Sequence, residues 1–272
     1  MPDDTITPTP RLATTERPAT TEPGAPDPVV VLLHGLGCER GQFAAQIRGL
    51  HPRLRLLSLD LPGHGASPRP RTEDHGLTAT ARAVTAELHA RHHQGVILVG
   101  HSAGGLVALT IAAEHPHLTR GIVLLDTNLT LDDTTRQANR SRARQAETGD
   151  WRQHFTASML AAWGSGHHPD EDPLASVLRT LQRTPESVLR PLWNEILTLD
   201  AIPLWRRCRV PSLYVRTKRG VDLRRLRLLN PRASAIDLRP QCDTHWPHVR
   251  CPDTVNEILN RFAAHLEPGR EG

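Results

Sequence analysis

The sequence predicts an α/β fold with a mostly parallel sheet that is covered by helices on both faces. Short, continuously apolar runs alternate along the chain with longer segments in which apolar residues recur at helical spacing. Strands that are apolar throughout are buried on both faces, which is typical of parallel sheets in α/β proteins. The length of 272 residues is enough to bury one sizeable core.

The elements of this pattern follow one another in order. Strands are predicted at residues 29–33, 54–59, 96–99 and 121–125. Helices are predicted between and after them at 42–50, 78–92 and 102–114. The sheet resumes at 210–215 and 235–238, and a helix at 254–265 completes the pattern.

The alternation stops between residues 127 and 200, where helical segments such as 151–163 and 186–199 follow one another without a strand. We expect residues 127–200 to form a helical cap, inserted after the strand that ends at Leu125 and placed over the carboxyl edge of the sheet. Residues 29–126 and 201–266 then form the core, and 267–272 form a tail. Residues 1–28 are rich in Thr, Pro and Glu, which predicts partial disorder or a short edge strand around 11–15.

The composition argues against a nucleic-acid or membrane partner. The formal net charge is +4, but Lys218 is the only lysine, and one tyrosine and three phenylalanines leave few platforms for base stacking. No apolar run approaches the length that spans a bilayer, and the first residues lack the pattern of a signal peptide. We expect a cytoplasmic protein that acts on a small molecule.

Neither the cysteines nor the histidines indicate a metal site. Cys38, Cys208, Cys242 and Cys251 fall in no C-x-x-C spacing, so we expect buried free thiols, with a Cys242–Cys251 pair as the alternative. None of the sixteen histidines lies in an H-E-x-x-H pattern. The sequence therefore predicts no metal and no organic cofactor.

Residues 96–109 carry the strongest motif. An apolar strand runs into Gly-x-Ser-x-Gly, centred on Ser102, and a helix follows. In this strand–turn–helix context the motif is the nucleophile elbow, in which a tight turn strains the serine backbone and exposes its hydroxyl. Side chains at Gly100 and Gly104 would collide with the turn, which explains both glycines.

Four stretches together resemble the α/β-hydrolase superfamily, over roughly residues 29–266. They are His34-Gly35 after a strand, the run from Asp60 to Ser67, the elbow, and Thr244-His245-Trp246-Pro247-His248 leading to Pro252. Their order and spacing look like the capped, single-domain branch. That branch includes small esterases, meta-cleavage-product hydrolases and cofactor-free haloperoxidase-like enzymes.

The resemblance implies a role for each of four residues. Ser102 would be the nucleophile and His245 its general base, because a serine hydroxyl needs a base whose pKa lies near neutrality. The backbone N–H groups of Leu36 and Ala103 would form the oxyanion hole, where a donor is typically worth about 3 kcal/mol.

The acid of the triad departs from the family pattern. The usual position lies in the loop at 216–222, where Gly220 fills the expected slot but Asp222 comes two residues late. Asp126 directly follows the strand at 121–125, in the alternative position that some haloalkane dehalogenases use. Both loops open at the same edge of the sheet. We prefer Asp126, because its spacing needs no adjustment.

The predicted function is cleavage of a small-to-medium carboxylic ester or thioester through an acyl-enzyme on Ser102. One alternative is a tailoring enzyme of the same fold, such as a C–C hydrolase, cyclase, lyase or perhydrolase. Another is a non-catalytic, ligand-binding homologue. Most tryptophans in or beside the cap are interpreted as core residues of its helices, and one or two would line an apolar pocket. The cluster Arg136, Arg140, Arg142 and Arg144 is interpreted as a solvated helix face, or alternatively as a means of steering an acidic substrate.

Overall fold

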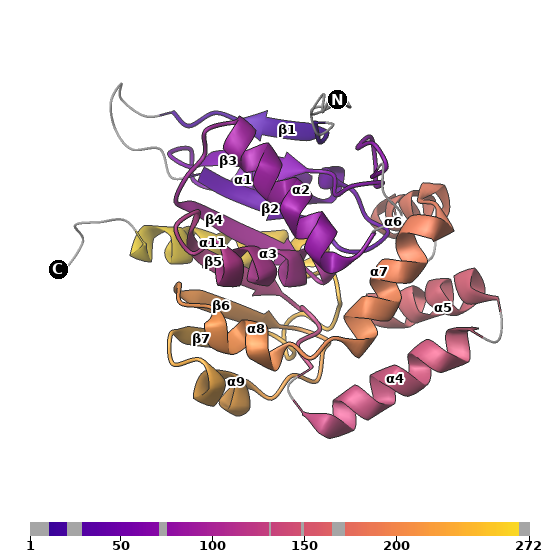
Figure 1. Cartoon of the computed structure of the whole chain (residues 1–272). Helices are drawn as coiled ribbons and strands as arrows, with labels where there is room; N and C mark the ends of the chain where they lie inside the picture. Colours follow the sequence, from indigo (N-terminus) through magenta and orange to yellow (C-terminus); the bar gives the residue numbers. More distant parts are fainter. Residues whose placement is uncertain are drawn as a thin grey trace, which may run out of the picture.

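The computed structural model describes residues 11–20, 29–70, 75–130, 132–147, 150–164 and 172–266. It contains a seven-stranded sheet in the order β1-β3-β2-β4-β5-β6-β7 (Figure 1). Its strands are β1 (Thr14–Arg17), β2 (Val29–Leu33), β3 (Arg55–Leu59), β4 (Val96–His101), β5 (Thr119–Leu125), β6 (Ser212–Arg216) and β7 (Ala233–Asp237). Only the edge pair β1–β3 is antiparallel, which confirms the predicted mostly parallel α/β sheet.

Helices cover both faces of the sheet. Successive strand residues point to opposite faces, so each strand contributes side chains to two separate cores. Val31 and Leu98 face one core, which includes α2 (Leu77–Ala90), α3 (Ala103–Glu114) and α8 (Ile202–Arg207). Val30 and Ile97 face the other, which includes α11 (Pro252–His265) and, beside it, α1 (Ala44–Gly49). The short elements η1 (Arg40–Phe43), α9 (Leu223–Leu229) and α10 (Pro247–Arg250) complete the layers.

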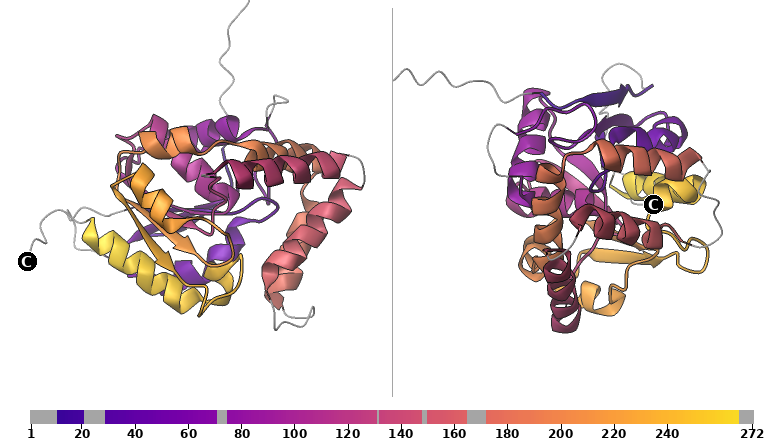
Figure 2. Two further views of the ribbon diagram at one scale, coloured as in Figure 1. Left: turned by 90° about the horizontal axis from the view of Figure 1, so that it is seen from below. Right: turned by 90° about the vertical axis from the view of Figure 1, so that its right-hand side faces the viewer.

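Four helices between β5 and α8 lie to one side of the sheet. They are α4 (Asp133–Glu147), α5 (Trp151–Trp163), α6 (Asp172–Arg183) and α7 (Glu186–Thr198). Figures 1 and 2 show them grouped beyond the end of the sheet. Phe155 of α5 and Trp193 of α7 pack edge to face with their ring centroids 5.8 Å apart, so an aromatic cluster joins these helices.

The predictions for the two ends of the chain can be compared with the structure only in part. The edge strand is observed at Thr14–Arg17 rather than at 11–15, where its residues pair with β3. The predictions for 1–10, 21–28 and 267–272 lie outside the described residues. No helix in the described part of the chain is both long enough and apolar enough to cross a membrane.

The thiol prediction is half correct. Cys38 and Cys208 are free and buried. Cys242 and Cys251, which were expected to be free, form a disulfide. The short helix α10 folds the chain back between them, so nine residues of sequence separation leave a Cα–Cα distance of only 6.5 Å.

Candidate active site

Ser102 stands at the junction of β4 and α3 in a strained backbone conformation. Its φ of 52° and ψ of −115° lie where side-chain-bearing residues are rare. The backbone N–H of Ser102 donates to the Leu125 carbonyl oxygen at 3.0 Å, which ties the turn to β5. A methyl group on Gly100 would collide with the Gly104 carbonyl, and one on Gly104 would collide with the carbonyl of Leu33. Both glycines are therefore required by space.

The two residues whose backbone N–H groups were expected to form the oxyanion hole lie next to Ser102: Leu36 lines the same cavity and Ala103 directly follows the serine. Leu36 follows Gly35, which lies so close to Ser102 that a methyl group on it would be 3.3 Å from the Ser102 Cβ. Ala103 is the first residue of α3, so its N–H has no partner within the helix. Neither N–H donates to an acceptor within the described residues. Both N–H groups thus remain available as donors, and their role as an oxyanion hole stays a prediction.

The turn that holds Leu36 is fixed by a buried histidine. His34 donates from Nδ1 to the Gly35 carbonyl oxygen at 2.8 Å and accepts from the Leu61 backbone N–H at Nε2 at 2.9 Å. Burial lowers the pKa of His34 to about 4, so the ring stays neutral and keeps both bonds. His34 therefore joins this turn to the start of the loop at Leu61.

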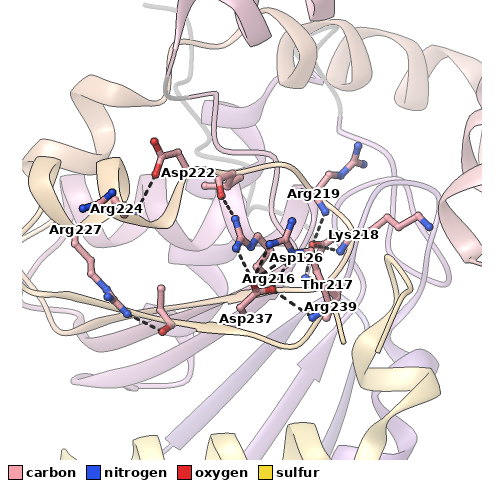
Figure 3. A network of polar contacts seen from close by, with 12 residues as sticks. Asp126, Arg216, Thr217, Lys218, Arg219, Asp222, Arg224, Arg227, Asp237 and Arg239 are labelled. Atoms are coloured by element: carbon pink, nitrogen blue, oxygen red, sulfur yellow. Dashed lines mark hydrogen bonds and ion pairs between the residues drawn. The ribbon is translucent and has the colours of Figure 1, made fainter. Parts of the chain in front are cut away.

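Asp126 and His245 meet at the carboxyl end of β5. His245 Nδ1 donates to Asp126 Oδ2 at 2.7 Å, and both side chains are buried. The other oxygen, Oδ1, accepts the backbone N–H groups of Thr217, Lys218 and Arg219 at 2.8–2.9 Å (Figure 3). Asp126, at a φ of 45°, is thus held by four donors that fix the orientation of its carboxylate.

Asp222 lies apart from this group. Its Oδ1 accepts the backbone N–H groups of Arg224 and Arg225, at 2.9 and 3.1 Å, and so caps the N-terminus of α9. Aspartate is a favoured N-cap residue for this reason. Of the two carboxylates considered for the triad, the structure brings Asp126 to His245 and leaves Asp222 in a local role.

Two hydrogen bonds and a disulfide hold the loop that carries His245. Thr217 Oγ1 donates to the Thr244 carbonyl oxygen at 2.5 Å, and the His245 backbone N–H donates to the Ala162 carbonyl oxygen at 2.9 Å. The Cys242–Cys251 disulfide closes the loop on both sides of the histidine. These contacts hold the His245 ring in place against the sheet and α5.

Arg219 occupies the side of His245 that faces the cavity. Its Nη2 lies 3.4 Å from His245 Nε2, which makes a long, weak hydrogen bond to the ring lone pair. No hydrogen bond joins Ser102 Oγ to Nε2 within the described residues. Since Nδ1 donates to Asp126, Nε2 is the nitrogen without a proton, which is the tautomer that a general base needs.

Burial and neighbouring charges set the protonation states. Burial and the nearby Arg219 cation lower the pKa of His245, against the opposing effect of Asp126. Burial raises the pKa of Asp126, but the bonds from His245 and from the backbone N–H groups outweigh it, so the net pKa is lowered. At neutral pH the pair is therefore an ionised carboxylate and a neutral imidazole.

Ser102, His245 and Arg219 open onto a cavity of about 360 Å³ between the sheet and the α4–α7 helices. One wall is apolar and comes from the two helices α5 and α7, with Phe155, Met159, Trp193, Ile196 and Leu197. The other wall is polar and includes Asn128, Arg142, Lys218 and Arg219. The described residues contain no cluster of three or more His, Cys, Asp or Glu side chains that could hold a metal ion.

Arg219 is the main residue that the sequence reasoning missed. It lies in the 216–222 loop, which was searched only for an acid. An arginine in a loop at the carboxyl edge of the sheet was the available signal. Arg142 was interpreted as part of a solvated helix face, with steering of an acidic substrate as the alternative, and the structure places it at the cavity.

Comparison with known proteins gives the family. Residues 30–258 match the model of the alpha/beta hydrolase family. A pimeloyl-[acyl-carrier protein] methyl ester esterase of Xanthomonas axonopodis pv. citri is 30% identical, over 87% of this chain and 95% of the relative. A putative carbamate hydrolase, RutD, of Klebsiella pneumoniae strain 342 is 33% identical over 56% of this chain, and that match spans only 59% of the relative.

Solved structures agree on the fold. An esterase of Thermogutta terrifontis superposes with a TM-score of 0.74 at 18% identity, covering 94% of this chain and 93% of the esterase. The chain belongs to the alpha/beta hydrolase family, and its named relatives are esterases and hydrolases. The resemblance that the motifs indicated is confirmed, as is the prediction of an enzyme of this family.

Proposed function

We propose that the protein is a serine hydrolase that cleaves a small-to-medium carboxylic ester or thioester through an acyl-enzyme on Ser102. The observation that carries the proposal is the Asp126–His245 hydrogen bond at 2.7 Å beside a serine on a strained elbow. The names of the relatives, a methyl ester esterase and a carbamate hydrolase, support acyl compounds as the substrate class. We also propose that α4–α7 act as the cap over this site.

In the first half-reaction, His245 Nε2 takes the proton from Ser102 Oγ as the oxygen attacks the carbonyl carbon. The negative charge that develops on the carbonyl oxygen is stabilised by the N–H groups of Leu36 and Ala103. His245 then returns its proton to the departing alkoxide or thiolate. Asp126 stabilises the imidazolium that exists between these two transfers.

Water completes the cycle. His245 removes a proton from the water as its oxygen attacks the acyl-enzyme, and gives that proton to Ser102 Oγ as the acid product leaves. The same groups serve both half-reactions, and no redox step or external cofactor is needed. Lowered pKa values of His245 and Asp126 keep the base neutral and the acid ionised at neutral pH.

A fluorophosphonate probe tests the proposal directly. Wild-type protein is expected to gain one adduct by intact mass, and Ser102→Ala and His245→Ala to gain none. Esters of graded chain length then define the acyl group. An unlabelled but folded wild-type protein would refute the proposal.

One observation favours a second candidate, a homologue that binds ligands without cleaving them. His245 Nε2 contacts Arg219 at 3.4 Å, where a working triad needs the serine hydroxyl. Apo sites often tighten only when substrate binds, which is why we rank hydrolysis first. The probe separates the two, because a binding protein whose histidine is blocked does not activate the serine.

A further inference from the structure

The polar wall of the cavity holds more positive charge than the described residues neutralise. Arg142, Lys218 and Arg219 line it, and no aspartate or glutamate does. Lys218 forms an ion pair with Asp243, at 2.9 Å. Neither Arg142 nor Arg219 forms an ion pair with a carboxylate of the described residues. Two arginines therefore face the cavity without an ion pair. The Asp126 carboxylate acts on Arg219 only through space, because its oxygens already accept hydrogen bonds from His245 and from the backbone.

Arg219 is the more informative of the two, because it is half-buried and its Nε is cut off from solvent. Its Nε is buried and has no hydrogen-bond partner in the described part of the chain, and its Nη2 makes only the long contact with His245. Burying a guanidinium in this way is costly unless an anion accepts its hydrogen bonds. In Figure 3 the side chains of Lys218 and Arg219 extend from the loop away from Asp126. A site that keeps such a cation beside its nucleophile is suited to an anionic ligand.

A second pocket of about 410 Å³ lies behind this wall. It shares Asn128, Arg142, Lys218 and Arg219 with the cavity, so these residues form the partition between the two spaces. The carboxylates at the far side, Asp132 and Asp222, are already engaged as local backbone caps. An anion is therefore attracted to the partition rather than to the far end.

We propose that the cavity binds acyl substrates carrying a second, ionised carboxylate, which pairs with Arg219 and Arg142 while the carbon chain lies on the apolar wall. The planar guanidinium can grip a carboxylate through two parallel hydrogen bonds. Arg219 lies next to His245, so the anion must lie close to the scissile carbonyl. Half-esters of short dicarboxylic acids fit this arrangement. The inference rests on the proposed hydrolysis at Ser102.

The same contact gives the anion a second effect. Arg219 donates to the lone pair of His245 Nε2 that must accept the Ser102 proton. A substrate carboxylate that accepts the hydrogen bonds of Arg219 moves the guanidinium away from His245. The Nε2 lone pair is then able to accept the hydrogen bond of the Ser102 hydroxyl. A neutral ester lacks this effect. We therefore expect neutral substrates to have lower kcat as well as higher KM.

The test compares monomethyl glutarate with methyl valerate, in which a methyl group replaces the carboxylate. Methanol release is measured at pH 7.5, and the readout is the ratio of kcat/KM values, anionic over neutral. We expect a ratio of at least about 10 in the wild type, since a hydrogen-bonded charge is worth about 10- to 100-fold. Arg219→Ala should lower the ratio about tenfold or more. Arg219→Lys should lower it by less, because lysine keeps the positive charge but cannot form two parallel hydrogen bonds to a carboxylate.

Arg144→Ala is the matched control, because Arg144 lies on α4 with Arg142 but does not line the cavity. This variant should keep the wild-type ratio, whereas Arg142→Ala should lower it. Far-UV circular dichroism and a thermal melt confirm that each variant is folded. A wild-type ratio near one, or a ratio that Arg219→Ala leaves unchanged, overturns the inference while hydrolysis at Ser102 still stands.

Failure of the proposed hydrolysis has a different signature, namely no turnover of either ester and no fluorophosphonate adduct. The inference is then decided by calorimetric titration with glutarate. Binding to the wild type that weakens at least tenfold in Arg219→Ala supports the anion site. No binding, or equal binding to both proteins, refutes it.

Discussion

Replacing Asp126 with asparagine should nearly abolish activity while leaving the fold intact. Asparagine has the same shape and tolerates the φ of 45° at this position. The three backbone N–H groups of Thr217, Lys218 and Arg219 need an acceptor, so they fix the amide oxygen at the Oδ1 position. The amide NH₂ group then faces the histidine in place of Oδ2.

This orientation forces the wrong tautomer. The NH₂ group donates toward His245 Nδ1, which must then accept, so the ring proton moves to Nε2. A protonated Nε2 cannot remove the proton of Ser102. The opposite amide orientation would set NH₂ against three N–H donors and lose three hydrogen bonds, which costs more than it restores. The expected loss in kcat is about 10⁴-fold, equivalent to about 5 kcal/mol at 1.36 kcal/mol per decade.

The assay is hydrolysis of a short-chain ester together with the rate of fluorophosphonate labelling. Asp222→Asn is the matched control, because its side-chain oxygen still accepts the N–H groups that begin α9. We expect less than a threefold change there. Equal losses in both variants, or a larger loss at Asp222, would refute the assignment of Asp126 and the tautomer argument with it.

Three further predictions follow from the same contacts. Burial and Arg219 lower the pKa of His245, so kcat/KM should rise with pH with a midpoint below about 6.5. Arg219→Ala removes a cation and should move that midpoint to higher pH. A shift to lower pH would contradict the proposed effect of Arg219 on the histidine. Serine substitution of Cys242 and Cys251 opens a nine-residue loop closure and should lower the free energy of unfolding in urea by about 2–3 kcal/mol; an unchanged midpoint would mean that the disulfide does not constrain the unfolded chain. Ser102→Gly should be more stable than Ser102→Ala by about 1 kcal/mol, because only glycine relieves the positive φ; the reverse order would show that the elbow is not strained.

The fold was predictable because the apolar runs, the helical spacing of apolar residues and the helix-end signals all indicate the same elements. Strand β2 and residues 96–99 of β4 are apolar on both faces, and the structure buries every residue of both strands. Helix α5 was predicted with its observed bounds, and the structure shows the local signals for them: the Asp150 side chain caps its start and Gly164, with a positive φ, follows its end. The short helix α9 was missed although Leu223, Leu226 and Leu229 recur at helical spacing, because it is only seven residues long and its start depends on the cap at Asp222.

The site was predictable where chemistry is tied to a local motif. The elbow of Ser102 requires its glycines, and His245 lies in a run that the family shares. Arg219 was not predictable in this way, because its role depends on contact with a residue 26 positions away. The disulfide was only the alternative prediction for the same reason. Two cysteines at that spacing can pair only if the chain between them folds back, which no composition rule states.

The position of the acid explains why the cavity can carry its positive wall. Asp126 extends from β5, so the loop after β6 supplies only backbone N–H groups to the carboxylate. Its side chains are therefore released from the triad, and Lys218 and Arg219 line the cavity instead. An acid supplied by that loop would place a carboxylate side chain beside the same histidine and occupy part of this surface. Because the acid follows β5 instead of β6, the carboxylate still accepts the hydrogen bond of His245. The Arg219 side chain then lies in the cavity, where it can contact the substrate.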